Sequence, residues 1–543
     1  MSRSRPRLGR LALVGVPLGF LAVFYLYPVI SILATGLYRE SGLDLTPLRE
    51  VLTSPSVRGV VWFTLWQAVV STLLTIVVAM PIAYVFARYQ FPGKRLMSAL
   101  LTVPFVMPTV VVASAFLALL GNSSPIGVNL SRTIWIILAA HVFYNVAIVV
   151  RAVGGLWSHL DPRLEEAARA LGATRGRAFL TVTLPLLRPA LAAAAAIVFL
   201  FTFTSFGVIL ILGGLNYATL EVEIYRQTTV FTDLPMAAAL AIVQLVGVTL
   251  ILWLYSRYQR HRSVGLSLMP SSTVARPPVT RRQWLAVGSA IGYAALVAGA
   301  PLAVLAARSF DNGSGGPFTF YRALTETGGS TASVSPLEAI GNSLWIALLA
   351  TAIALVVGMS AAAVVAYRSG RASRAFDVLL MLPLGTSAVT IGFGMLIALD
   401  WPVDLRASVL LIPLAHALVA IPFVVRLSVP VMRSVRPQLR EAAASLGASP
   451  GRVWREVDLP IAARALAVSA GFAFAISLGE FGATSFIARP DTPTLPVAIF
   501  RLLGRPGTLN FGRAMAMSTI LMAVTASVIL MVDRFRVRDV GDF

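Results

Sequence analysis

Long apolar runs constrain this chain more than any other feature of its sequence. A helix needs about 20 mainly apolar residues to cross the hydrocarbon core of a bilayer. The 543-residue sequence contains twelve such runs, and only 12% of its residues are charged. We predict an all-α integral membrane protein with membrane-spanning helices at 11–37, 60–87, 97–120, 133–153, 190–212, 236–256, 284–306, 343–367, 376–399, 406–429, 463–487 and 512–533.

Basic residues between the apolar runs indicate how the chain is oriented. Lys and Arg are enriched in the cytoplasmic loops of membrane proteins. With the N-terminus inside, 32 of the 44 Lys and Arg residues fall in cytoplasmic segments. We therefore expect both termini in the cytoplasm. The first apolar run is too long for a cleaved signal peptide, so we expect it to remain as a membrane-spanning helix. The same loops account for the net charge of +21, so no nucleic-acid partner is expected.

The sequence repeats itself at a fixed offset of 275 residues. Without a gap, this offset pairs identical residues at 141 and 416, 151 and 426, 162 and 437, 172 and 447, 185 and 460, 206–207 and 481–482, and 219–220 and 494–495. We predict two tandem homologous halves of six helices each, spanning 1–255 and 284–543, with a cytoplasmic linker at 256–283. An even number of helices gives both halves the same orientation, as in a parallel repeat with a pseudo-twofold axis along the membrane normal.

The most similar pair of segments in the two halves is polar. "EEAARALGA" begins at residue 165 and "REAAASLGA" at residue 440. Each segment, 161–185 and 436–460, is expected to be a short helix, a glycine turn and a second helix. The apolar stripes of the first helices are Leu164, Ala167, Ala168 and Leu171, and Leu439, Ala442, Ala443 and Leu446. Such a helix could rest on lipid headgroups, but the alanine-rich stripe and its duplication favour docking to a partner.

These two segments resemble the EAA loop of permease subunits in binding-protein-dependent ABC importers. The family pattern of Glu-Ala-Ala, three variable residues and Gly is present as Glu166, Ala167, Ala168 and Gly172, and as Glu441, Ala442, Ala443 and Gly447. The resemblance implies the type I ABC importer permease fold in a bacterial cytoplasmic membrane. It also implies coupling helices that seat on two separate ATP-binding cassette subunits, and an extracytoplasmic substrate-binding protein that delivers the solute.

Polar residues inside apolar runs are functional candidates in membrane proteins. Glu480 lies well inside the eleventh predicted helix, and the offset pairs it with Ser205. It could be a gate residue, a polar clamp between helices or a residue near the outer surface. In the family this helix lines the translocation path, so the resemblance implies a path containing Ser205, Phe206, Glu480 and Phe481. His141 and His416, which open the fourth and tenth predicted helices, are expected to form interhelical hydrogen bonds.

No residue pattern in this chain suggests catalysis, metal binding or nucleotide binding. It has no cysteine and four histidines, which argues against a metal site, and no G-x-x-x-x-G-K-[ST] phosphate loop. We expect a transport subunit without catalytic residues, metal or cofactor, and ATP hydrolysis in a partner. An ion-coupled secondary transporter is the more distant alternative, although it would carry more midplane carboxylates and no duplicated docking loop.

The substrate is suggested by one further resemblance. "FTSFGVILILGGLNYATLEVEIYRQ" in the first half is similar to the thiamine permeases. We expect Glu221, Glu223 and Asp233 to face outward, above Glu480, where they would suit a cationic ligand such as thiamine. They could equally be surface residues that contact the binding protein. Ferric iron is the close alternative, since fused twelve-helix permeases of this kind also resemble the ferric-iron branch.

Overall fold

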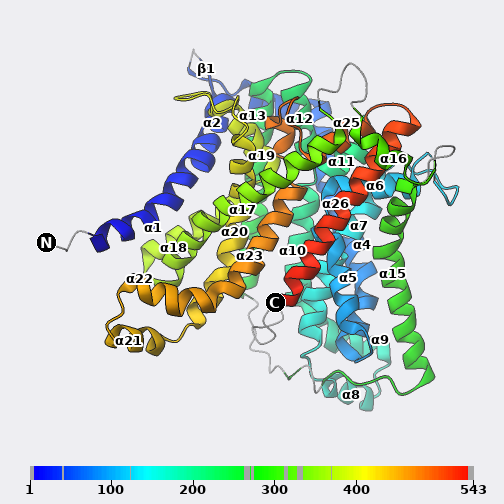
Figure 1. The fold of residues 1–543 in the computed structure, drawn as a ribbon. Coiled ribbons are helices and arrows are strands. Elements are labelled where there is room, and N and C mark those ends of the chain that lie inside the picture. The colour runs from blue at the N-terminus through cyan, green and yellow to red at the C-terminus, as the bar shows by residue number, and fades with distance from the viewer. Residues whose placement is uncertain are drawn as a thin grey trace.

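The computed structural model describes residues 5–39, 42–122, 124–261, 269–270, 274–310, 316–326, 334–368 and 370–535. It is a bundle of long helices that run roughly along one direction, with shorter helices at both ends (Figure 1). Within the described residues the sheet structure is one hairpin, β1 Tyr38–Arg39 and β2 Gly42–Leu43, and one isolated bridge. The prediction of an all-α membrane protein is confirmed.

The first half contains the helices up to His261. In chain order they are α1 Arg5–Leu21, η1 Ala22–Leu26, α2 Tyr27–Leu37, α3 Thr46–Thr53, α4 Pro55–Arg88, α5 Lys94–Val106, α6 Thr109–Leu120, α7 Ile134–Trp157, α8 Arg163–Ala170, α9 Arg175–Ala178, η2 Phe179–Thr183, α10 Leu184–Phe203, α11 Gly207–Leu212, α12 Leu220–Thr229 and α13 Leu234–His261.

The second half repeats this order from Arg281 onward. Its elements are α15 Arg281–Phe310, α16 Thr319–Arg322, η3 Ala323–Thr325, α17 Pro336–Tyr367, α18 Arg371–Gly385, α19 Ala388–Ala398, α20 Leu411–Ser434, α21 Pro437–Ser445, α22 Pro450–Val453, η4 Trp454–Asp458, α23 Leu459–Gly479, α24 Thr484–Ile487, α25 Leu495–Leu503 and α26 Thr508–Phe535.

Among the described residues, nine helices are long and apolar enough to cross a membrane, or twelve if each bent pair counts as one span. The run predicted at 97–120 is two helices, α5 and α6, bent by 100° at Met107–Pro108. The run at 376–399 bends by 97° between α18 and α19 in the same way. Pro108 disfavours helical backbone at the residue before it, and Met107 is extended. A hydropathy scan counts such a pair as one straight helix because it detects composition and not direction.

The two halves exchange their first helices. α1 and α2 of the first half pack against α17 and α19 of the second, while α15 of the second half packs against α4 and α6 of the first. Figure 1 shows α1 and α15 on opposite sides of the bundle. One exchange contact is a buried hydrogen bond of 2.7 Å between the hydroxyls of Tyr25 and Thr386. The halves are therefore interlocked, and the exchange keeps the pseudo-twofold arrangement.

The linker expected at 256–283 is shorter than predicted. α13 continues to His261 and α15 already begins at Arg281, so helical residues occupy both ends of the predicted range. Residues 262–268 and 271–273 lie outside the described residues. Near its end, Arg276 forms a parallel bridge with Tyr89, and its carbonyl accepts a 3.0 Å hydrogen bond from the Gln90 amide. This part of the linker thus lies against the first half.

Candidate functional site at the central break and the duplicated loops

The first candidate site is a break in two pseudo-equivalent helices. α10 ends at Phe203 and α23 at Gly479, and the backbone that follows each is not helical. Directly after the breaks, the rings of Phe206 and Phe481 stack with centroids 5.4 Å apart and an interplanar angle of 27°. Tyr225 packs edge-on against Phe206, and Phe500 packs edge-on against Phe481, each at 5.5 Å. The 275-residue offset relates both pairs, so a symmetric row of four rings joins the halves.

Glu480 lies in this break, where its carboxylate caps the next helix. The prediction that it lies well inside a helix is wrong, because α23 ends one residue before it and Glu480 itself is extended. Its Oε1 accepts a 2.9 Å hydrogen bond from the Ala483 amide, and its Oε2 accepts one of 3.0 Å from the Thr484 amide. The buried carboxylate thus satisfies two backbone donors that the break leaves without helical partners.

Each half also holds a buried histidine that connects helices beside the break. His141 of α7 bonds Ser71 of α4 at 3.0 Å through Nδ1 and Ser205 at 2.9 Å through Nε2. His416 of α20 bonds Ser477 of α23 at 2.8 Å, and its Nε2 lies 3.3 Å from Glu480 Oε2. The prediction of interhelical hydrogen bonds is confirmed for both histidines. Ser205 and Glu480 therefore hold pseudo-equivalent places beside the two imidazoles.

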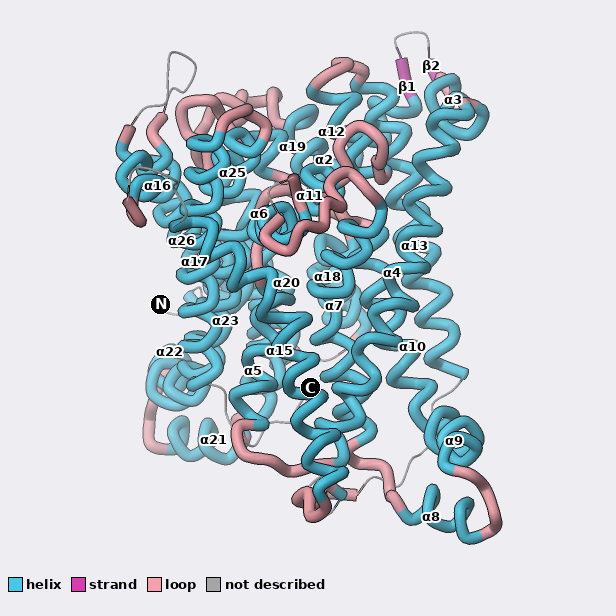
Figure 2. The backbone as a smooth tube through the Cα atoms, turned by 90° about the vertical axis from the view of Figure 1, so that its right-hand side faces the viewer, coloured by secondary structure: helices cyan, strands magenta, loops and turns pink. Residues whose placement is uncertain are grey.

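The second candidate site is the pair of duplicated loops, α8–α9 and α21–α22, which project from one end of the bundle (Figure 2). Each turn between the helices depends on a glycine in the left-handed region, Gly172 with φ of 91° and Gly447 with φ of 83°. The preceding leucines, Leu171 and Leu446, are 90% and 89% exposed. Two exposed leucines at equivalent positions form a matched apolar surface that the described part of the chain leaves uncovered.

The remaining residues of the predicted motif follow the same pattern in both copies. Glu166 and Ala167 are exposed and Ala168 is half-buried in α8, while Glu441, Ala442 and Ala443 repeat this order in α21. The second helix of the first copy is capped by Thr174, whose hydroxyl accepts a 3.3 Å hydrogen bond from the Arg177 amide. The two motifs therefore present equivalent surfaces.

A third group of polar residues lies between the halves and was not predicted. The expectation that Glu221 faces outward is wrong, because this residue of α12 is buried. Its carboxyl accepts a 2.8 Å hydrogen bond from Gln244 of α13 and also bonds Ser387, the N-cap residue of α19 in the other half. Burial raises the pKa of Glu221 to about 8, and the two hydrogen bonds lower it by less. The repeat gave no signal for this group, because Pro496 is the counterpart of Glu221.

The other two acidic residues of the predicted outward group have local partners. Glu223 Oε1 accepts a 2.7 Å hydrogen bond from Gln227, and its Oε2 lies 3.9 Å from Arg226. Asp233 caps α13 by accepting a 3.0 Å hydrogen bond from the Met236 amide. Within the described residues, no cluster of three or more His, Asp and Glu side chains could hold a metal ion.

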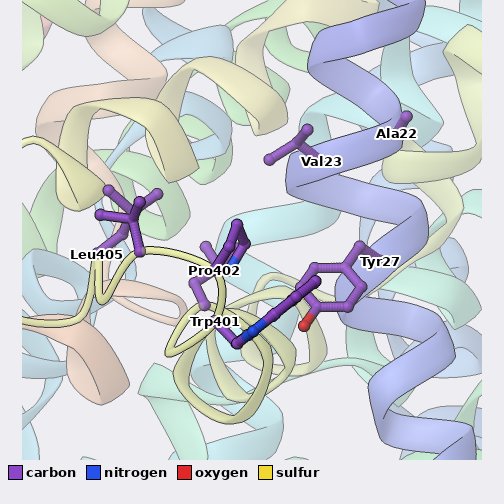
Figure 3. Close-up of a pocket in the computed structure, with 8 residues that line it drawn as sticks. Ala22, Val23, Tyr27, Trp401, Pro402 and Leu405 are labelled. Atoms are coloured by element: carbon purple, nitrogen blue, oxygen red, sulfur yellow. The ribbon is translucent and has the colours of Figure 1, made fainter.

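One apolar cavity of about 540 Å³ lies apart from these sites (Figure 3). It opens between the start of the first half and the loop after α19, and its lining includes Ala22, Val23, Tyr27, Trp401, Pro402 and Leu405. It contains none of the predicted site residues.

Comparison with known proteins decides the family of this chain. The family described as "Binding-protein-dependent transport system inner membrane component" matches residues 76–264 and again residues 354–538. The chain belongs to this family. It is a fused permease with two copies of the family domain, and the duplicated loops and the central break lie within both copies.

Relatives of this permease include fused chains and single halves. The thiamine transport system permease protein ThiP of Brucella abortus is 28% identical over 489 residues, covering 87% of this chain and 86% of that protein. The probable ABC transporter permease protein y4fN of Sinorhizobium fredii is 25% identical and covers 94% of both chains. The sulfate transport system permease protein CysT of Escherichia coli is 36% identical over 230 residues, covering 40% of this chain and 82% of that protein.

Proposed function

We propose that this permease imports thiamine, which a binding protein delivers from outside, by alternating access driven by two separate ATPase subunits. The choice of thiamine as the substrate is supported by the similarity to ThiP, which extends over 87% of this chain. The first permease half runs to His261 and the second begins at Arg281, and the linker between them lies on the cytoplasmic side with both termini.

The duplicated loops are the docking sites for the ATPase subunits. Their exposed leucines, Leu171 and Leu446, and the glutamates Glu166 and Glu441 form two matched surfaces at the same end of the bundle. ATPase subunits that close on one another symmetrically need two equivalent contacts, and this chain supplies both. The resemblance of the two segments to the EAA loop supports this assignment, which also places this end in the cytoplasm.

The row of rings around Phe206 and Phe481 is the gate of the translocation path. Residues of both halves meet there, so a rocking movement of one half against the other separates the stacked rings. Ser205 and Glu480 line the same break, where the backbone is non-helical. Irregular backbone at membrane depth is tolerated where protein covers it or where it lines a cavity, which supports a path at this point.

Glu221 is the residue that balances the positive charge of thiamine. Its carboxyl is buried between the halves, and no Lys, Arg or His of the described chain forms an ion pair with it. An acidic group placed in this way favours a cationic solute over an anion once the halves separate. While the halves are closed, burial holds the pKa of this carboxyl at about 8 and its partners are the neutral side chains of Gln244 and Ser387. The carboxyl ionises and can pair with the cation once the halves separate and water reaches it.

Uptake by a deletion strain tests this function. A strain that lacks its own thiamine, ferric-iron and sulfate importers is supplied with this permease and its partner subunits. We expect uptake of labelled thiamine to be restored and to be lost when the ATPase subunit is omitted. Restored uptake of iron or sulfate without thiamine would refute the substrate and leave the importer assignment intact.

A further inference from the structure

A second set of contacts, behind the exposed surface, holds each duplicated loop onto a spanning helix. In the first half, Glu165 of α8 accepts a 3.2 Å hydrogen bond from the hydroxyl of Thr183. In the second half, Arg440 of α21 donates a 2.7 Å hydrogen bond from Nε to Asp458. The 275-residue offset pairs Glu165 with Arg440 and Thr183 with Asp458. Both halves therefore place one polar contact at the same site.

The backbone at this site is also repeated. Thr183 and Asp458 are the last residues of two π-helical segments, η2 and η4, which begin at equivalent residues and lead directly into α10 and α23. A π turn inserts an extra residue into a helix, and such turns are frequent at functional sites. Both side chains are buried although the loops in front of them are exposed. Each contact therefore ties a projecting loop to the base of a spanning helix.

The chemistry of the contact differs between the halves. In the first half the loop carries the acid, which also lies 3.9 Å from the guanidinium of Arg88. In the second half the loop carries the base, and the guanidinium of Arg440 lies 4.2 Å from the ring centre of Tyr367. The position is thus kept polar and paired in both halves although the sign of its charge differs. The two halves therefore keep the position of this contact although its chemistry differs, since Thr183 is neutral and Asp458 is acidic.

We propose that these pairs, Glu165–Thr183 and Arg440–Asp458, are latches that make each coupling loop move as one lever with its spanning helix. The spanning helices α10 and α23 end at the break that holds Phe206 and Phe481. A displacement of either loop is therefore transmitted to the gate along one of these helices. Arg440 and Asp458 are therefore positioning residues for coupling and not docking residues. This inference rests on the proposed function, because it assumes that ATPase subunits push on the loops.

The latch of the second half should be the more sensitive of the two to substitution. Asp458 is buried, and removal of Arg440 takes away its cationic partner and leaves its carboxylate with the Tyr367 hydroxyl. A matched control lies on the same segment, where Arg452 and Glu456 form an exposed ion pair of 2.9 Å. Exposed pairs of this kind contribute little. Arg440→Ala and Glu456→Gln thus remove similar contacts that differ in burial and in position.

The test uses the complete transporter, with permease, ATPase and binding protein in lipid vesicles. Copurification of the ATPase reports on docking, and the ratio of substrate uptake to ATP hydrolysis reports on the latch. We expect Arg440→Ala to retain the ATPase and to lower this ratio at least about fivefold, the lower end of known coupling effects. Glu456→Gln should leave both unchanged. An unchanged ratio for Arg440→Ala, or an equal loss in the control, would overturn the latch, whereas failure of the wild-type chain to bind an ATPase would overturn the proposed function.

A cross-linked variant keeps the test valid if Arg440→Ala folds poorly. The chain has no natural cysteine, so Arg440→Cys with Asp458→Cys provides the two reactive thiols of the permease. A short dithiol cross-linker that joins them should restore the ratio that the unlinked variant has lost. If the linked protein hydrolyses ATP without uptake, the loop must detach during the cycle and the latch is refuted.

Discussion

Phe206 and Phe481, which are 275 residues apart in sequence, stack on one another at 5.4 Å between the two halves of the permease. Their partners Tyr225 and Phe500 extend the row symmetrically. Phe206 follows α10 and Phe481 follows α23, and each of these helices leads back to one of the duplicated loops. The arrangement links the two candidate sites, because the loops and the rings are the two ends of the same pair of elements.

Removal of either stacked ring should make the path leak. An aromatic pair contributes about 0.5–1.5 kcal/mol beyond its buried area, so its loss should raise the population with separated rings roughly two- to tenfold. We expect Phe481→Ala to increase the ATP-independent flux of substrate into proteoliposomes by this factor. Phe310→Ala, in an aromatic cluster with Phe318 and Tyr321 outside the row, is the control and should leave the flux unchanged. A Phe481→Ala variant with the same ATP-independent flux as the wild type would contradict the assignment of these rings as the gate.

Loss of the Glu480 charge should destabilise the break. Hydrogen bonds to charged groups contribute about 1.5–3 kcal/mol, so we expect Glu480→Gln to lower the free energy of unfolding by about 2 kcal/mol. Thermal unfolding in detergent measures this as a lower midpoint. The effect should not add to that of His416→Ala, because the two side chains are in contact at 3.3 Å. Additive effects would show that the carboxylate and the imidazole act independently.

The pKa of Glu221 predicts a pH dependence of stability. Burial raises the pKa of this carboxyl from its usual value of 4.5 to about 8 in the folded protein. Between these values the folded chain binds the proton and the unfolded chain does not, so stability should fall as pH rises from about 4.5 to about 8 and level off above. Glu221→Gln should remove this contribution. Glu223→Gln, on the same helix, should retain it, and identical pH profiles for both variants would contradict the assignment.

The glycine turns of the loops should tolerate no side chain. A residue with Cβ costs roughly 1–2 kcal/mol in left-handed backbone, about a tenfold shift in population. Gly172→Ala and Gly447→Ala should therefore weaken ATPase docking by about this factor. Gly176→Ala is a fair control, because it lies in α9 with open space around it. Binding measured by cosedimentation should remain normal for Gly176→Ala, and equal losses in all three variants would show that the left-handed turn is not the cause.

Repetition and hydropathy predicted most of this architecture from sequence. Gly172 and Gly447 were identifiable as left-handed turns because a glycine directly follows each apolar stripe, and both have positive φ. The break at Glu480 was not identifiable, because the polar residue stands in an apolar run and its capping partners are local amides. The contact of Glu221 with Ser387 depends on packing between the halves, and one sequence carries no signal for such a contact.

The central claim, that the two loops of this single chain seat two ATPase subunits, is tested most directly by copurification with both loops altered. Glu166→Lys with Glu441→Lys reverses an exposed charge at the same place in each loop, while both side chains remain outside the folded core. We expect the wild-type chain to retain two ATPase subunits. The double variant should retain none and should still insert into the membrane. A double variant that binds the ATPase subunits and supports uptake would contradict the account.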